Sequence, residues 1–357
     1  TLTVTDPAGN RRDGGAIAAL DHKSAAVFLI DWLEKQPGFD SVRAVGHRVV
    51  HGMKHTEPEI VTPELIAELH RISPSDPAHL PGEIELIEEF GQRHRAIPQL
   101  ACFDTAFHQN MPRVAKMLAI PRRLDRKGIQ RYGFHGLSCA YLVEALNGLG
   151  DPAATNGRVI LAHLGNGASI SAVRDGKSID TSMGFTPTGG LPMSTRSGDL
   201  DPGLVGYLAR TERMTAAQFD RMVNSASGLL GLSEISSDMR DLLDCEERDE
   251  RAAEAVAVFC YRARKLIGAY AAALGGLDTL VFSGGIGENA PLVRARICEG
   301  LSFLGIDLNE SRNAAAEDVV SIGKSRVIVR VIRTDEELMI ARLVLNSPAI
   351  LVTAGGD

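Results

Sequence analysis

The sequence has few features of membrane, secreted or nucleic-acid-binding proteins. No apolar run approaches the roughly 18 residues of a transmembrane helix, and no basic segment followed by an apolar one opens the chain. The five cysteines never form a C-x-x-C pair, which disfavours a disulfide framework and a thiolate zinc site. The net charge is −7 and basic residues are dispersed. We therefore expect a reduced, cytoplasmic protein that binds neither nucleic acid nor a membrane.

Short motifs of several common enzyme classes are also missing. The chain has no G-x-G-x-x-G and no G-x-x-x-x-G-K-[ST], which disfavours Rossmann-type and P-loop nucleotide binding. His47, His51 and His55 recur every four residues, but the β-branched Val49 and Val50 between them favour a strand over the helix that a metal ladder needs. H-E-x-x-H does not occur, so a zinc enzyme is not expected.

The 357 residues, of which 44% are hydrophobic, are enough for about two domains with packed cores. Apolar periodicity predicts strands that alternate with helices, which favours an α/β fold with mixed sheets. The predicted strands are 42–50, 99–103, 158–164, 168–173, 178–182, 279–283 and 326–332. The predicted helices are 24–35, 63–71, 83–94, 252–274, one opening at Pro291, and 335–345, and the Pro-rich segment 73–82 is a predicted loop. Residues 1–10 form one strand and the turn of a hairpin, whose second strand precedes or follows closely.

Two glycine turns each follow an apolar strand. HLGNGASIS (163–171) has a glycine on either side of Asn166, so that bare backbone N–H groups could approach a phosphate chain. SGGIGEN (283–289) lies between a strand and a helix N-terminus, where the helix dipole favours an anion. A single glycine motif of this kind is more often an ordinary tight turn than a phosphate site. The presence of two such motifs after separate strands makes that interpretation weaker.

Arg48 in GHRVVHG (46–52) and Arg196 in PMSTRSGDLDPG (192–203) are flanked by small or flexible residues. A guanidinium binds a carboxylate or phosphate bidentately, so both are candidate anion clamps, although each could instead bond carbonyls of its own loop. Asp104 follows a predicted strand, where carboxylates commonly face a cleft.

The remaining polar candidates are less specific. His108 in FDTAFH and His135 in RYGFHG have aromatic neighbours, and such histidines are more often core or loop residues than catalysts. Glu336 lies in the acidic start of the last helix, where it either offsets the helix dipole or binds a metal. Phosphate-binding turns, two arginines and carboxylates without a nucleophile pair together suit phosphoryl transfer.

Seven motifs in one order resemble those of the acetate kinase family, which belongs to the acetate and sugar kinase, Hsp70 and actin superfamily. They are GHRVVHG, CFDTAFH, RYGFHG, HLGNGASI, PMSTRSGDLDPG, FSGGIGENA and TDEELMIA. The resemblance implies an α/β fold of two ribonuclease H-like (actin/Hsp70-type) domains with mixed sheets and an ATP site in the interdomain cleft. It implies an N-terminal acyl-substrate domain of residues 1–108 plus 338–357, and a nucleotide-binding and dimerisation domain of residues 109–337.

The resemblance also assigns roles by motif. Asp104, His135 and Arg196 would be catalytic: Arg196 would steady the transferring phosphoryl group and His135 would stabilise the transition state. Arg48 would bind the acyl carboxylate, and Val50 and Pro187 would line a pocket for the methyl group. The nucleotide would lie on three segments, made of His163, Leu164, Gly165, Asn166 and Gly167; of Asp238, Met239 and Arg240; and of Gly285, Ile286, Gly287, Glu288 and Asn289.

The implied reaction is reversible transfer of the γ-phosphoryl group of ATP to acetate, giving acetyl phosphate and ADP. Glu336 would help to hold Mg²⁺ or Mn²⁺, and the chain would form a homodimer. Because acetate is already an anion at pH 7, it needs no base to become a nucleophile. We therefore expect Asp104 to orient the metal or its water, although the family is often described with this residue as a proton acceptor.

The chain departs from the family pattern at several points. The family's opening strand and its loop rich in Asn, Gly and Ser with a Lys have no counterpart, so the strand at Thr1 is expected to be half of a hairpin whose other half carried phosphate contacts. SPSDPAHLPG (73–82) replaces the usual Leu-His-Asn-Pro stretch, and Met53, Ser194 and Asp335 replace two glycines and an asparagine. The alternatives are a propionate or butyrate kinase of the same family, or a truncated, non-catalytic nucleotide-binding dimer.

Overall fold

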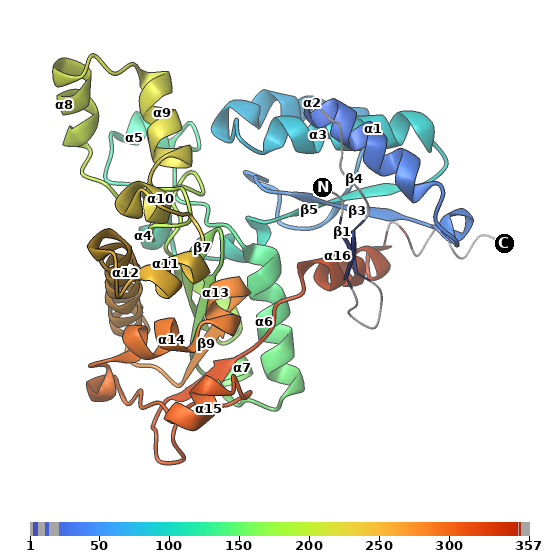
Figure 1. The fold of residues 1–357 in the computed structure, drawn as a ribbon. Coiled ribbons are helices and arrows are strands. Elements are labelled where there is room, and N and C mark those ends of the chain that lie inside the picture. The colour runs from blue at the N-terminus through green and yellow to red at the C-terminus, as the bar shows by residue number, and fades with distance from the viewer. Residues whose placement is uncertain (1–2, 6–10, 14–20, 349, 351–357) are drawn as a thin grey trace. The chain divides into compact units, whose positions relative to one another are not determined.

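The computed structural model describes residues 3–5, 11–13, 21–348 and 350, and the chain divides into two units (Figure 1). Unit 1 comprises residues 1–52, 57–103 and 340–357. Unit 2 comprises residues 53–56 and 104–339. Each unit contains a mixed β-sheet with helices packed on it, as the alternation of strand and helix patterns predicted.

The sheet of unit 1 has the order β3-β5-β4. β3 (Val45–Val49) runs parallel to β5 (Gln99–Phe103), and β4 (Glu59–Ile60) is antiparallel to β5. Figure 1 shows α1, α2 and α3 over one face of this sheet and α16 over the other. These helices are α1 (His22–Leu33), α2 (Pro63–Ile72), α3 (Leu80–Arg93) and α16 (Glu336–Leu345), the last of which begins in unit 2.

Two helix starts in unit 1 follow from local sequence. Thr62 caps α2 by accepting a hydrogen bond from Leu65 N at 3.2 Å, with Pro63 in the first turn, which is where the predicted helix 63–71 begins. The predicted loop 73–82 is wrong at both ends, because 73–75 form a 3₁₀ turn and α3 begins at Leu80. Pro81 permits this early start, since a proline in the first turn removes no helical hydrogen bond.

A short hairpin at the N-terminus also belongs to unit 1. β1 (Thr3–Thr5) pairs antiparallel with β2 (Arg11–Asp13), which follows it in the chain. The expectation that the other half of this hairpin was a lost segment with phosphate contacts is therefore wrong. The predicted turn at residues 6–10 lies outside the described residues.

The five-stranded sheet of unit 2 has the order β10-β9-β6-β7-β8. β6, β7 and β8 form an antiparallel meander, whereas β9 and β10 add parallel strands on the other side of β6. The β7–β8 turn uses Asp175 and Gly176 with φ of +52° and +72°, the hairpin geometry that an Asp-Gly pair favours. The strands are β6 (Arg158–Leu164), β7 (Ala168–Arg174), β8 (Lys177–Thr181), β9 (Thr279–Ser283) and β10 (Ile328–Val331).

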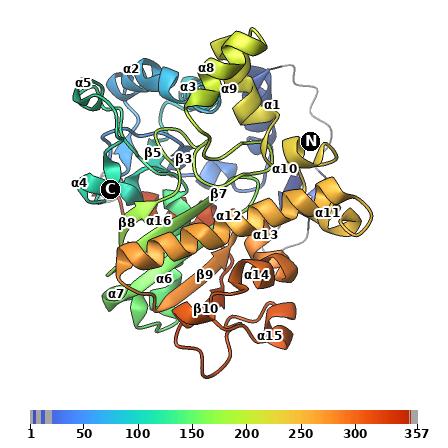
Figure 2. The same ribbon diagram turned by 90° about the vertical axis from the view of Figure 1, so that its left-hand side faces the viewer.

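Two long helices cover this sheet. In Figure 2, α12 (Glu250–Leu274) crosses in front of the strands and α6 (Gly136–Gly148) lies behind them. The predicted apolar stripe of α12 is buried, and the helix ends at Gly275 with φ of +70°. Cys139 and Leu142 of α6 pack with Val159 and Leu161 of β6 in the core.

Shorter helices connect these layers. The segment 284–289, predicted to be a turn, is instead the short helix α13. The other helices are η1 (Phe39–Ser41), η2 (Ser73–Ser75), η3 (Ala106–His108), α4 (Arg113–Lys116), α5 (Arg122–Asp125), α7 (Ala153–Asn156), α8 (Gly203–Thr211), α9 (Ala216–Ser225), α10 (Gly228–Ser233), α11 (Met239–Cys245), α13 (Gly284–Asn289), α14 (Pro291–Cys298), η4 (Ser302–Leu304) and α15 (Glu310–Ala314).

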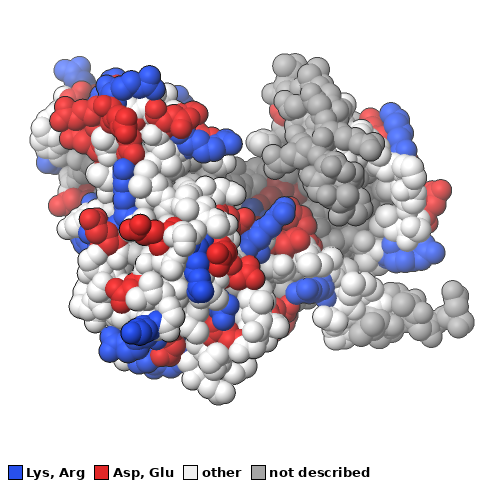
Figure 3. Space-filling view, turned by 60° about the horizontal axis from the view of Figure 1, so that its bottom comes forward, with Lys and Arg blue, Asp and Glu red and all other residues white. Residues whose placement is uncertain are grey.

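Charged side chains of both signs lie on the surface (Figure 3). Acidic and basic side chains are interspersed over the face drawn in Figure 3. Within the described part of the chain, no helix combines the length and the apolar character needed to cross a membrane.

Candidate active site

Asp104 lies immediately after β5 and is fully buried in unit 2. Its carboxylate accepts hydrogen bonds from His135 N at 3.2 Å and from Leu137 N at 3.4 Å, and its main-chain oxygen accepts from Gly136 N at 2.8 Å. Asp104 therefore satisfies three N–H groups at the start of α6. A Cβ on Gly136 would lie 2.2 Å from the Asp104 carbonyl oxygen, so this approach requires glycine.

His135 is held by its backbone and by its ring. Its φ of +58° places it in the left-handed region, a conformation that a non-glycine residue adopts only when the surroundings impose it. Nδ1 shares a hydrogen bond with Ser169 Oγ of β7 at 3.0 Å, and the ring lies 4.2 Å from the His163 ring, centroid to centroid. The side chain is therefore fixed before any ligand arrives.

Hydroxyl groups extend this network to the last helix. His163 Nδ1 and Ser138 Oγ are 2.8 Å apart, and the same oxygen lies 2.8 Å from Thr334 Oγ1. Ser138 is on α6, and Thr334 lies two residues before Glu336. Sequence reasoning missed Ser138 and Thr334, because a lone hydroxyl in a helix or loop carries no recognisable pattern.

The two glycine segments come together at the ends of neighbouring strands. β6 and β9 are parallel and pair His163 with Ser283, so the segments after them meet at one edge of the sheet. A Cβ on Gly165 would lie 3.7 Å from Gly285 N. A Cβ on Gly167 would lie 2.9 Å from His135 Nε2 and 3.5 Å from Arg196 Nη1. The two glycine segments therefore meet at Gly165, and the His135 ring and the Arg196 guanidinium lie close to Gly167.

Glu288 organises the second glycine segment. Its Oε1 accepts hydrogen bonds from Gly284 N at 2.8 Å and from Thr334 N at 3.2 Å. Asn289 Nδ2 donates to the Gly285 carbonyl oxygen at 2.9 Å. Glu288 thus links the N-terminal end of α13 to the segment that precedes Glu336.

Arg196 lies on a loop tied to the first glycine turn. Its Nη1 is 3.4 Å from the Pro187 carbonyl oxygen and 3.7 Å from Met193 Sδ. Ser194 N donates to the Asn166 carbonyl oxygen at 3.2 Å, which joins this loop to the β6–β7 turn. The structure therefore brings Arg196, Pro187 and Asn166 into one neighbourhood.

Other predicted residues of unit 2 belong to the start of α11, the end of β6 and α13. Asp238 caps α11 by accepting from Arg240 N at 2.9 Å, and the side-chain hydrogen bond from the Arg240 guanidinium lowers the pKa of Asp238. Leu164 and Met239 are buried, and Ile286 and Gly287 belong to α13.

His108 is a core residue, the alternative that its aromatic setting favoured. It is fully buried, Nδ1 and Ser178 Oγ are 2.8 Å apart, and Nε2 is 3.0 Å from the Phe134 carbonyl oxygen. Because a carbonyl oxygen only accepts, Nε2 carries the proton and Nδ1 accepts from Ser178.

Two carboxylates near Cys139 suit a divalent cation. Burial raises the pKa of the Cys139 thiol to about 12, and the negative charges of Asp104 and Glu336 add to this shift. Asp104 and Glu336 therefore each lie within electrostatic reach of Cys139. No group of three His, Cys, Asp or Glu side chains suited to a metal occurs among the described residues. Mg²⁺ at phosphoryl-transfer sites needs only one or two carboxylates besides water and phosphate oxygens, so these residues fit.

Two of the predicted acyl-binding residues, Arg48 and Val50, lie in unit 1, whereas Pro187 lies in unit 2. Arg48 is on β3, paired with Cys102 of β5, and Val50 follows the strand with 3% of its surface exposed. Val50 N donates to Glu83 Oε2 at 3.0 Å, and burial raises the pKa of Glu83 to about 7. Sequence reasoning missed Glu83, because its contact spans 33 residues and follows no motif.

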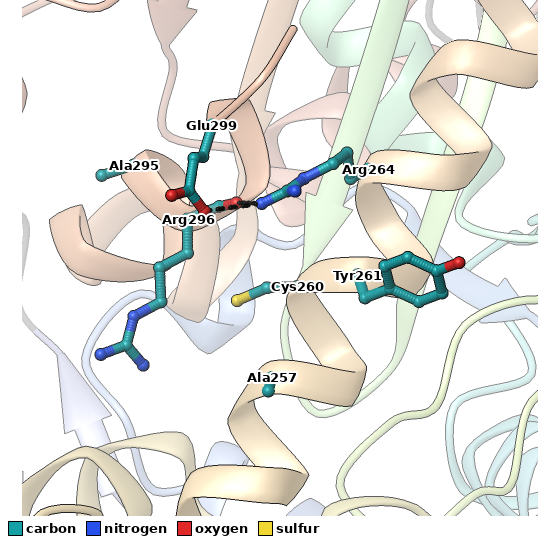
Figure 4. A pocket seen from close by; sticks show the side chains of 7 residues that line it. All are labelled: Ala257, Cys260, Tyr261, Arg264, Ala295, Arg296 and Glu299. Atoms are coloured by element: carbon teal, nitrogen blue, oxygen red, sulfur yellow. Dashed lines mark hydrogen bonds and ion pairs between the residues drawn. The ribbon is translucent and has the colours of Figure 1, made fainter.

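A further pocket of about 460 Å³ lies between α12 and α14, and Figure 4 shows its lining side chains. Arg264 and Glu299 form an ion pair of 3.1 Å there, and Arg296 is bonded to Glu246 at 2.6 Å. None of the predicted site residues lines this pocket.

Comparisons with known proteins identify the family. The model of the Acetokinase family matches residues 3–342. Acetate kinase from Rhodopseudomonas palustris (strain ATCC BAA-98 / CGA009) is 45% identical over 342 residues, covering 95% of this chain and 85% of the relative. Acetate kinase from Methylocella silvestris is 44% identical over 346 residues, covering 96% and 85%.

Two solved structures share the fold. Porphyromonas gingivalis acetate kinase aligns with a TM-score of 0.85 and 38% identity, over 98% of this chain and 89% of the other. A propionate kinase from Francisella tularensis aligns with a TM-score of 0.85 and 39% identity, over 90% and 83%. The fold is therefore the ribonuclease H-like (actin/Hsp70-type) α/β fold with mixed sheets. The chain belongs to the acetokinase family and is a phosphotransferase with a carboxyl group as acceptor.

Proposed function

We propose that this chain is an acetate kinase that transfers the γ-phosphoryl group of ATP reversibly to acetate by direct in-line displacement. The observation that carries the proposal is the close approach of His135 and Arg196 to Gly167, two residues from Gly165, where the two glycine segments meet. Relatives that cover most of the chain are named acetate kinase, which supports the same substrate.

The proposed step joins an acetate oxygen to the γ-phosphorus and breaks the bond from that phosphorus to the β,γ-bridging oxygen. The bridging oxygen keeps the electron pair, so the products are acetyl phosphate and ADP. No proton has to move, because acetate is ionised at neutral pH. Repulsion between the carboxylate and the phosphate oxygens is the main obstacle, and the Arg196 guanidinium with the His135 ring would offset it.

We assign nucleotide binding to unit 2. Gly165, Gly167 and Gly285 have no side chain that would keep a phosphate oxygen from the backbone of residues 163–167 and 285–289. We assign Asp238, Met239 and Arg240 to the nucleotide on the motif alone. Arg48 and Val50 of unit 1 and Pro187 of unit 2 are assigned to the acyl group in the same way.

Glu336 would hold Mg²⁺ or Mn²⁺, with Asp104 orienting the ion or its water. When bound, the cation would neutralise charge on the phosphate oxygens. Asp104 has a second task that needs no metal, because its carboxylate fixes His135 N and Leu137 N at the start of α6. We also propose a homodimer, which light scattering of the purified protein would test.

Acyl phosphate formation from Mg-ATP and acetate, propionate or butyrate, trapped as the hydroxamate, tests the proposal. We expect the highest kcat/KM with acetate, and Arg196→Ala, purified identically, controls for contaminating kinases. Preference for propionate would favour the activity named for the Francisella relative. Absence of turnover with all three acids, together with measurable ATP binding, would contradict a kinase and leave a nucleotide-binding dimer.

A further inference from the structure

Glu83 interacts with Arg48 and Val50, the two predicted acyl-binding residues of unit 1. It lies in the first turn of α3, and its Oε2 accepts a hydrogen bond from Val50 N at 3.0 Å. The Arg48 guanidinium is near enough for its positive charge to stabilise the ionised Glu83 carboxylate. One carboxylate therefore holds the backbone at Val50 and interacts with the cation two residues earlier.

A second carboxylate lies behind Glu83. Asp76 is 3% exposed, and its Oδ1 is 2.8 Å from His79 Nδ1. Its Oδ2 is buried and has no hydrogen-bond partner among the described residues. The charge of Asp76 disfavours ionisation of Glu83, whereas His79 favours it. Asp76 and His79 belong to the segment 73–82, which replaces the family's Leu-His-Asn-Pro stretch.

Other ionisable groups reach α3 from its neighbours. His22 of α1 lies against Gly82, where a Cβ would be 3.2 Å from the His22 ring. His70 of α2 pairs with Glu88 farther along α3, at 3.0 Å. From the sheet, the positive charge of Arg48 on β3 favours ionisation of Glu83.

We propose that Glu83 is a positioning residue whose ionised carboxylate competes with the acceptor carboxylate for Arg48, so that affinity for the acceptor falls as the pH rises. The inference rests on the proposed function, in which Arg48 binds that carboxylate.

The physical reason is linkage between a proton and an anion. A guanidinium that faces two carboxylates binds each one more weakly than it binds one alone, because the two negative charges repel. Acceptor binding therefore favours protonated Glu83, and protonated Glu83 favours the acceptor to the same extent. Partial burial raises the pKa of Glu83 to about 7, so Glu83 gains or loses its proton within an accessible pH range. An oxygen of either form can still accept from Val50 N.

The test is the KM for acetate between pH 6 and pH 8.5 at saturating Mg-ATP. We expect the wild-type KM to rise about tenfold over this range, the effect of one pKa unit of coupling, while kcat changes little. In Glu83→Gln, which keeps an acceptor for Val50 N, the KM should stay low and constant. Glu85→Gln, an exposed carboxylate on the same helix, is the matched control and should follow the wild type.

The variant Asp76→Asn tests whether the pH dependence of KM follows the ionisation of Glu83 in the proposed direction. Removal of the charge that disfavours ionisation of Glu83 should move the midpoint of the KM profile to lower pH. A merely structural role for this cluster would alter stability without moving the midpoint.

Calorimetry of acetate binding in buffers of different ionisation enthalpy gives a readout that needs no turnover. We expect proton uptake near pH 7.5 in the wild type and none in Glu83→Gln. A flat wild-type profile, or the same profile in Glu83→Gln, would overturn the inference while leaving the kinase intact. Failure of every acid to react would contradict the proposed function instead, and proton uptake on binding would then still decide the role of Glu83.

Discussion

The two regions assigned to the reaction are built from different chemistry. In unit 2, His135, Ser169, His163 and Ser138 are joined by hydrogen bonds and ring contact. In unit 1, Glu83 lies within reach of charged groups, namely Arg48, Asp76 and His79. The nucleotide region is therefore fixed by short-range geometry, whereas the acceptor region depends on how charge is shared.

This difference predicts how each region fails. These hydrogen bonds and glycine contacts depend on the exact positions of their atoms, so a misplaced atom in unit 2 should lower kcat. Charge balance depends on pH, so changes in unit 1 should alter acceptor affinity and selectivity more than rate.

Arg196→Ala should have the largest effect on the rate. We expect kcat to fall about 10³-fold with little change in ATP affinity, because the guanidinium acts on charge that develops in the transition state. Steady-state kinetics and nucleotide titration measure the two quantities. Arg210→Ala, on the exposed surface of α8, is the matched control. An unchanged kcat would remove Arg196 from the catalytic region.

Acidification should destabilise unit 2 through His108. Burial lowers the pKa of His108 to about 4, below its unfolded value near 6.5, so the unfolded chain binds more protons between these pH values. The contribution of neutral His108 is therefore complete above pH 6.5 and is lost as the pH falls to about 4. The loss should be about 3 kcal/mol.

Acidification over the same pH range should destabilise unit 1 less than unit 2. Burial lowers the pKa of His47 to about 4, which gives the same loss on acidification, whereas the raised pKa of Glu83 stabilises the folded state as the pH falls from about 7 to its unfolded value near 4.5. Hydrogen exchange of β8 and β3 amides, corrected for intrinsic rates, compares the two units. Equal acid sensitivity of both strands would contradict the comparison, and His108→Gln should flatten the response of β8.

Gly167→Ala should disturb unit 2 by shape alone. The new Cβ would lie 2.9 Å from His135 Nε2, so the ring or the turn must shift. We expect kcat to fall about tenfold to a hundredfold. Gly148→Ala is the control, since its Cβ would meet nothing within 4 Å. Equal kcat values for the two variants would show that the close approach has no role in the reaction.

Val50→Ala should change selectivity in unit 1 with the smallest effect. Removal of two methyl groups enlarges the space for the acyl chain, so the kcat/KM ratio of propionate to acetate should rise roughly threefold to tenfold. Val45→Ala, in the strand that precedes Val50, should leave the ratio unchanged. A constant ratio in Val50→Ala would count against its place beside the acyl chain.

Local sequence predicted many elements of the fold. Thr62 and Pro63 marked the start of α2, and Gly275 marked the end of α12. Predictions failed where a local signal had two outcomes: Pro81 begins a helix instead of extending a loop, and the glycines of 284–289 form a short helix. Glycine and proline allow a turn, but packing decides whether a helix forms there.

The order of motifs along the chain, the apolar periodicity and the glycines at 165, 167, 284, 285 and 287 are properties of the sequence itself, and they were enough to indicate the family and its chemistry. Tertiary structure alone decided which distant groups meet. Pairing of β6 with β9 brings Gly165 to Gly285, and packing of α3 on β3 brings Glu83 to Val50. Such contacts join segments far apart in the chain, and the hydrogen bonds and pKa shifts that they create depend on three-dimensional neighbours that no local pattern records.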